Sequence, residues 1–436
     1  MKRIFPATLV IALAACSPED DQSESLGETS EALNGDLSSQ GFLTRKSNGI
    51  LPLNEPARRA DTDSYYDTVG TDRFGGSAPS IRSSIGTLED FQTRYEFTSG
   101  SEFTASYYNR GDLGLGREMH CKVTSESEAA CYVTNFAAGS DGSEFTFGLS
   151  RDIAFDNMDA ENAVATVAMV YRPLATGNLV IFAVYDASGD LTNTAPLDRH
   201  GLNFFNAFAA NGNSDPGTAG TPGVEFNNHI PSNCLNCHGG TYSPGAAPQV
   251  ANAYFLPFDL DQFEFQDVPG KTLDAQQDQF RNLNQLVRGV AGQGGITNHP
   301  IYAQIQGWYG NTNLGSLSGN FRPEFVPDGW DDTSEDIVAY RSVVRPSCRA
   351  CHMASQSFPF NTAASFPAAL ASNLLESNSM PHALQTQREF WQSGQPVALE
   401  TWFTQKGETE AANTLRAAGP KNIVTLDPHL IATAIP

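Results

Sequence analysis

Two short motifs in this chain have the residue types and spacing that attach a haem covalently. Residues 234–238 read Cys-Leu-Asn-Cys-His, and residues 348–352 read Cys-Arg-Ala-Cys-His. In a Cys-x-x-Cys-His motif, the two thiols add across the vinyl groups of one porphyrin and the histidine becomes an axial ligand of the iron. We therefore expect two covalently bound haem c groups, attached through Cys234, Cys237 and His238 and through Cys348, Cys351 and His352.

The cysteine inventory favours haem over the alternatives, which are a Cys₂His₂ zinc site or two disulfide loops. The chain has seven cysteines, of which four belong to the motifs. The others are Cys16, Cys121 and Cys131, and none is placed to complete a zinc tetrahedron. Cys121 and Cys131 lie in strand-like stretches and are expected to form a disulfide in an oxidising compartment. Two free thiols, or a metal site with His120, are the alternatives for this pair.

The region around the second motif resembles class I cytochromes c. A helix expected over residues 331–344 precedes the motif, and Met380-Pro381 and a helix over residues 382–393 follow it. This order covers roughly residues 330–395. The resemblance implies that Met380 is the second axial ligand of this iron. His382 is a competing ligand, and core packing is the ordinary role of such a methionine.

The first motif departs from that pattern, because no methionine lies between His238 and Cys348. His299 is the leading candidate for the distal ligand, since it stands just before Pro300, where a helix over residues 301–308 could start. His229 and His200 are further candidates, and a five-coordinate or water-ligated iron remains open. Surface exposure or packing in the core is the ordinary alternative for His299.

Three arginines could pair with haem propionates, because guanidinium groups bind carboxylates in a bidentate manner. Arg345 and Arg349 adjoin or lie within the second motif, and Arg288 lies on a helix expected over residues 272–291. Ordinary salt bridges are an equally good interpretation of all three.

The N-terminus is typical of an exported protein. Lys2 and Arg3 precede an apolar run over residues 4–15, which is too short to span a bilayer. The run ends in Leu-Ala-Ala-Cys16 and resembles a bacterial lipoprotein signal. The resemblance implies cleavage before Cys16, lipidation of that residue and, with Ser17 next, anchoring in the outer membrane facing the periplasm. An ordinary secretory peptide is the alternative.

Composition and hydrophobic patterning predict an α+β protein. Residues 1–15 form the signal peptide, and residues 16–60 are an acidic, disordered tether. Residues 61–210 are predicted to be an antiparallel β-rich domain, with short runs such as 164–170 and 179–184 separated by turn residues. A mainly helical part follows, divided into a first haem region (211–325) and a second, cytochrome c-like haem domain (326–436).

The net charge of −23 bears on partners. Such a surface repels nucleic acid and would steer a basic redox partner by long-range attraction. Acidity that only maintains solubility is the alternative.

Three classes of function fit these features. An electron-transferring dihaem c-type cytochrome on a lipoprotein is favoured. An enzyme resembling dihaem peroxidases or oxygenases, with an open first haem, is the second, and we assign no catalytic residue for it. A haem-containing binding or sensing lipoprotein is the third, and its support is the β-rich region.

Overall fold

The computed structural model describes residues 56–418 with gaps. The gaps are residues 71–78, 113, 125–127, 137–154, 157, 159–161, 174–177, 194–205, 208–225, 228–229, 247, 293–298, 311–315, 355–359, 361, 367–385, 387–388 and 392. The predicted signal peptide and nearly all of the predicted tether therefore lie outside the described residues.

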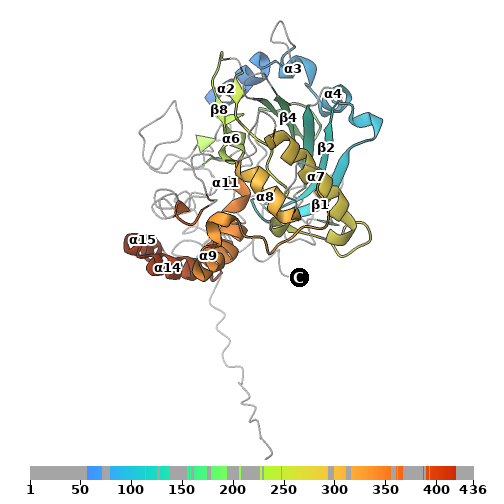
Figure 1. Ribbon diagram of the computed structural model, residues 1–436. Coiled ribbons are helices and arrows are strands. Elements are labelled where there is room, and N and C mark those ends of the chain that lie inside the picture. The colour runs from blue at the N-terminus through green and yellow to red at the C-terminus, as the bar shows by residue number, and fades with distance from the viewer. Residues whose placement is uncertain are drawn as a thin grey trace, which may run out of the picture.

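An antiparallel sheet forms the centre of the molecule (Figure 1). Its eight strands run in the order β10-β1-β2-β3-β4-β5-β9-β8. Five of them form a meander, in which each strand pairs with the next along the chain: β1 (Phe103–Asn109), β2 (Leu115–Val123), β3 (Ala129–Phe136), β4 (Ala163–Pro173) and β5 (Asn178–Asp186). The mixed α+β class and the antiparallel pairing predicted from the sequence are thus confirmed.

The outer strands of the sheet come from beyond the predicted β-rich domain. They are β8 (Thr241–Tyr242), β9 (Val250–Ala251) and β10 (Phe263–Glu264). β9 pairs with β5 at one edge, and β10 pairs with β1 at the other. The chain that follows the first haem motif therefore crosses the whole sheet, so this segment belongs structurally to the β-rich part. A separate pair, β6 (Asn206–Ala207) and β7 (Phe226–Asn227), lies outside this sheet.

The helices are mostly short: α2 (Pro56–Thr68), α3 (Ile81–Ser84), α4 (Leu88–Arg94), α6 (Ser232–His238), α7 (Leu273–Gly292), α8 (Pro300–Tyr309), α9 (Ser334–Ala339), α10 (Arg345–Ser347), α11 (Arg349–His352), α14 (Gln395–Lys406) and α15 (Thr409–Ala418). α7 packs on the sheet, whereas α14 contacts α15 and α9 to one side of it (Figure 1). α7 and α8 agree with the helices predicted over 272–291 and 301–308. The helix predicted over 331–344 is present as α9 with a π-helical continuation, Tyr340–Val344. Most of the predicted helix 382–393 lies outside the described residues.

The two faces of the sheet have different neighbours. On one face, Phe91 of α4 contacts the rings of Tyr132 and Tyr185. On the other face, Phe280 of α7 contacts Tyr107. Side chains in a strand alternate between faces, so each strand contributes to both layers.

Side chains from helices satisfy the backbone groups that the outermost meander strands would otherwise leave unpaired. The N–H groups of Phe182 and Val184 in β5 donate to the hydroxyls of Tyr65 and Tyr66 in α2, at 2.9 and 3.2 Å. At the opposite edge, Gln276 of α7 accepts from the N–H of Ser106 and donates to its carbonyl, at 2.7 and 2.9 Å. Protected edges resist pairing with other chains, and these contacts fix the helices to the sheet.

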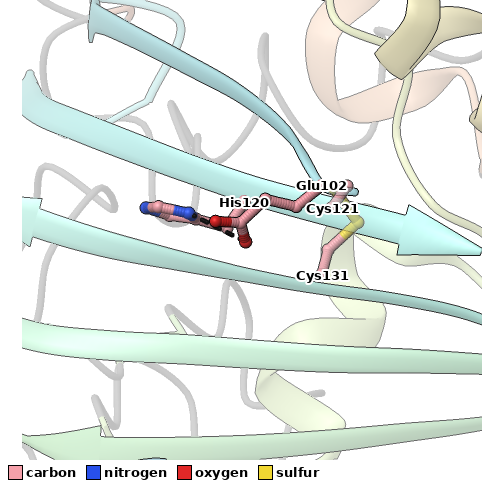
Figure 2. The surroundings of a disulfide bond; sticks show 4 residues. All are labelled: Glu102, His120, Cys121 and Cys131. Carbon is pink, nitrogen blue, oxygen red and sulfur yellow. Dashed lines mark ion pairs between the residues drawn. A yellow bond between two sulfur atoms is a disulfide. The ribbon is translucent and has the colours of Figure 1, made fainter. Parts of the chain in front are cut away.

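The disulfide predicted between Cys121 and Cys131 is present, and it joins β2 to β3 at directly opposed positions. His120 beside it stacks on Tyr132, with ring centroids 4.5 Å apart. The His120 ring also lies between two carboxylates, with Nδ1 3.2 Å from Glu102 and Nε2 2.9 Å from Glu118 (Figure 2 shows Glu102). His120 therefore forms ion pairs with these carboxylates when it is protonated.

Replacing both cysteines, as Cys121→Ala with Cys131→Ala, should lower the free energy of unfolding by about 2–3 kcal/mol, because the unfolded chain then loses a closed loop. Urea unfolding of the mature protein, followed by far-UV circular dichroism, measures this change. Reduction of the wild-type disulfide should move the midpoint in the same direction. An unchanged midpoint for the double variant would contradict a stabilising role.

The His120 ion pairs should make stability depend on pH. Burial by itself lowers the pKa of His120, but hydrogen bonds and charges from Glu118 and Glu102 outweigh it and raise the pKa. A raised folded-state pKa gives stability below the ordinary value near 6.5, which is lost as pH rises through the folded value. The urea midpoint of wild type should thus exceed that of His120→Gln by more at pH 6 than at pH 9. An equal difference at both pH values would rule this linkage out.

Candidate functional site

The two Cys-x-x-Cys-His motifs lie side by side in the fold, although more than a hundred residues of sequence separate them. The first occupies α6 and the second begins at the end of α10 and occupies α11, and these two helices are in contact (Figure 1). Cys237 of the first motif and Cys351 of the second line the same cavity. The fold therefore brings both candidate attachment sites into one centre.

A glycine makes this close approach possible. Gly239 follows His238 directly and has a positive φ of 68°. A Cβ atom there would lie 2.4 Å from the carbonyl oxygen of Ala354, which stands just beyond the second motif. Any side chain at position 239 would thus push the two motif segments apart.

His238 is held in the tautomer that an iron ligand needs. Its Nδ1 donates a hydrogen bond to the carbonyl oxygen of Tyr254 at 2.7 Å, and its own carbonyl accepts from the N–H of Tyr254 at 3.0 Å. A carbonyl can only accept, so Nδ1 carries the proton and Nε2 presents its lone pair. This second contact is the usual way in which metal-binding histidines are oriented. Burial lowers the pKa of His238 to about 4, so the ring is neutral near pH 7.

A cavity of about 280 Å³ opens between the first motif and the sheet. Its walls include Cys234, Cys237 and His238 from α6, and Ala350 and Cys351 from α11. The segment that crosses the sheet closes another side, with residues from Phe255 to Phe263. The ring of Phe182 in β5 stands edge-on to the ring of His238, with centroids 5.4 Å apart. The exposed surface inside the cavity is mainly apolar, which suits a large flat hydrophobic group.

The chemistry of the thiols also fits haem attachment. Burial raises the pKa of Cys234 to about 12 and the pKa of Cys348 further still. The pKa of Cys351 is raised by its hydrogen bond with Cys237 and by burial. These sites disfavour thiolates. A thioether is neutral, so conversion of the four thiols to thioethers would leave no buried charge to stabilise.

The second motif is surrounded by aromatic side chains. The ring of His352 lies 4.0 Å from that of Phe360, and burial lowers its pKa to about 4. Behind it, the indole of Trp330 contacts Phe366 and Trp402, and its Nε1 donates to the carbonyl of Phe360 at 2.9 Å. These tryptophans are buried and form the packed wall of this part of the molecule.

Arg349 has partners from the protein, and they differ from the propionates expected as one possibility. Its guanidinium donates to both carboxylate oxygens of Asp259, at 2.7 and 2.6 Å, and to Asp261 at 2.7 Å. Its Nη1 donates to the hydroxyl of Tyr340 at 3.0 Å, and the group also lies over the ring of Trp308. Burial alone would lower the pKa of Arg349, but the charge of Asp259 outweighs it and raises the pKa. Arg349 thus ties the second motif to the segment that follows the first.

The other predicted propionate partners are also engaged elsewhere. Arg345 donates to the carbonyl of Pro323 at 3.0 Å. Arg288 donates to Gln285 at 3.2 Å and lies over the ring of Tyr302. Neither side chain lines the cavity of the first motif.

His299, the leading distal candidate, does not line that cavity either. It is the N-cap of α8, where its Nδ1 accepts from the N–H of Ile301 at 3.3 Å. Its ring packs on Tyr254 at 4.2 Å, on the residue whose carbonyl holds Nδ1 of His238. The ligand assignment stays a prediction, and the geometry gives it no support.

Several predicted residues lie outside the described part of the chain. They are Met380, the competing His382, the lipidation site Cys16, and the further candidates His200 and His229. Their roles stay predictions.

The contribution of the sheet to this site was not predicted from the sequence. Arg117, Met119 and Met169 all line the cavity from β2 and β4. Arg117 donates to Asp112 at 2.5 Å and to Asn135 at 2.9 Å, which places an ion pair inside a mainly apolar cavity. One signal was present in the sequence: Met119 stands two residues before Cys121, so alternation puts both on one face. The pairing of β3 with β4 that adds Met169 could not be read from the sequence.

Comparisons of the chain with protein-family models, curated proteins and solved structures found no match. Among the described residues, no three His, Cys, Asp or Glu side chains gather in an arrangement that could hold a metal ion. Within the same residues, no helix is long and apolar enough to cross a membrane.

Asp259→Asn should lower the free energy of unfolding by roughly 3 kcal/mol, because it leaves the buried guanidinium of Arg349 without its bidentate partner. The value lies at the low end for such pairs because Asp261 remains. A suitable control is Glu400→Gln, which breaks an exposed pair with Arg416 and should cost about 0–1 kcal/mol. Urea midpoints compare the two variants. Equal losses of unfolding free energy in the two variants would show that the buried Arg349–Asp259 pair matters no more to stability than the exposed Glu400–Arg416 pair.

Proposed function

We propose that this protein is a dihaem c-type cytochrome that transfers electrons in the bacterial cell envelope. Cys234, Cys237 and His238 would hold one haem, and Cys348, Cys351 and His352 the other. When bound, haem c supplies reversible one-electron chemistry at its iron. The lipid anchor at Cys16 would tie the chain to the outer membrane, facing the periplasm.

The observation that carries the proposal is the contact between the two motifs. Two attachment sites on touching helices, with Cys237 and Cys351 lining one cavity, suit a closely spaced pair of redox groups. A protein with two independent roles would have no need for this contact. The tight approach at Gly239 and the clamp at Arg349 both hold this spacing, and neither depends on a bound group.

The protein residues would keep the first site ready to bind. Tyr254 fixes His238 with Nε2 unprotonated, and most of the surface inside the cavity is apolar. A rigid, mainly apolar site reduces the reorganisation that accompanies a change of charge. The acidic chain, with a net charge of −23, would attract a basic redox partner.

One observation favours the enzyme alternative. Arg117 and Asp112 place a cation and a carboxylate inside the cavity of the first motif, where they could bind or protonate a small substrate. An open iron at that site would then act on peroxide or oxygen. Spectroscopy separates the two functions, because an electron carrier has closed, low-spin irons.

Mass spectrometry of the matured protein tests the haem assignment. Wild type should carry two porphyrin additions, and Cys234→Ala with Cys237→Ala should carry only one, as should Cys348→Ala with Cys351→Ala. The matched control is Cys121→Ala with Cys131→Ala, which should keep both. A colourless, unmodified wild type would end the proposal. A second test is the absorption spectrum with cyanide and with peroxide: no change supports electron transfer, and a reactive high-spin iron supports the enzyme.

A further inference from the structure

We infer that the sheet supplies the second axial ligand of the first haem, and that this ligand is the sulfur of Met169. The inference rests on the proposed haem at Cys234, Cys237 and His238. It gives the β-rich part of the chain a role in the redox site, because the second ligand is then a strand methionine and not a histidine.

The cavity walls offer few groups that can bind iron. Among the described residues that line it, His238 is the single histidine, and it already serves the proximal side. Cys131 is in the disulfide, so its sulfur is not a free thiolate. Haem iron accepts histidine nitrogen or methionine sulfur at an electron-transfer site. Met119 and Met169 are the methionines in the wall.

The strand register favours Met169 over Met119. Met169 in β4 is directly paired with Phe182 in β5, whose ring contacts the ring of His238. Directly opposed residues on neighbouring strands have side chains on the same face, with Cβ atoms about 5 Å apart. The side chain of Met169 therefore neighbours that of Phe182, which in turn contacts the proximal histidine, His238. Met119 lies two strands further from β5, beside Val133, and is aligned with a different row of residues.

The surroundings of Met169 also suit a sulfur ligand. It is 7% exposed and belongs to the wall of a mainly apolar cavity, where a soft thioether is well accommodated. Methionine is unbranched and flexible, which lets the sulfur adjust to the ring. The strand that carries it is paired on both sides over most of its length, to β3 and to β5, so its backbone is firmly fixed. A ligand on a rigid element is held more precisely than one on a loop.

The test replaces each methionine with leucine, which conserves volume and removes only the sulfur. Met169→Leu and the matched control Met119→Leu are compared with the wild-type haem protein. In the reduced state, a methionine bound to haem iron gives a methyl proton resonance shifted far upfield by the ring current. Met169→Leu should lose one such resonance and should bind cyanide at one iron. Met119→Leu should keep every resonance and resist cyanide as wild type does.

The outcomes separate this inference from the proposed function. If Met169→Leu keeps all upfield methyl resonances, or if Met119→Leu loses one, the assignment to Met169 is overturned. Both variants should still show two porphyrin additions by mass, so their folding and maturation are checked independently. A wild type without covalent haem would instead defeat the proposed function itself.

Discussion

The architecture depends on one buried ion pair, between Arg349 in the second motif and Asp259 in the segment after the first. The carboxylate of Asp259 and the guanidinium of Arg349 are both almost fully removed from solvent, with 2% and 3% of their side chains exposed. Burying two charges is costly, so such a pair adds little net stability compared with an apolar contact. Its effect is on specificity, because an arrangement that separates these partners would leave an isolated charge in the interior. The pair thereby disfavours packings in which the second motif is separated from the segment after the first.

The sheet takes part in the same constraint. After the first motif, the chain pairs with β5 through β9 and then with β1 through β10. Asp259 lies between these two pairings and there contacts Arg349. The tyrosines of α2 and the glutamines of α7 fix the two margins of the meander. The β-rich part is therefore one wall of the site rather than an accessory domain. This explains why Arg117 and two methionines, all from strands, face the thiols of the motifs.

Local patterns in the sequence were enough to predict many of the helices and strands of this molecule. The long-range pairing of its strands could not be predicted from such patterns. Short apolar runs bounded by turn residues identified β4 and β5, and the helical periodicity of residues 272–291 identified α7, because these signals lie within one element. The disulfide followed from two nearby strand-like cysteines. His299 was chosen for its position before a proline, and that position made it a helix cap. The wall opposite His238 is set by which strand pairs with which, and a single sequence carries no direct trace of that pairing.

The two motifs are chemically alike but their surroundings differ. The first opens on a cavity whose wall combines thioether side chains with the Arg117–Asp112 ion pair, whereas the second is enclosed by Trp330, Phe360 and other rings. A positive charge near an iron favours its reduced form, and a nearby carboxylate opposes that effect. The second motif carries charges of its own, because Arg349 lies within it and is paired with Asp259 and Asp261, and aromatic rings adjoin it. If both sites hold haem, the difference in surroundings alone would give the two irons unequal reduction potentials, and unequal potentials in a touching pair set a direction for the electron.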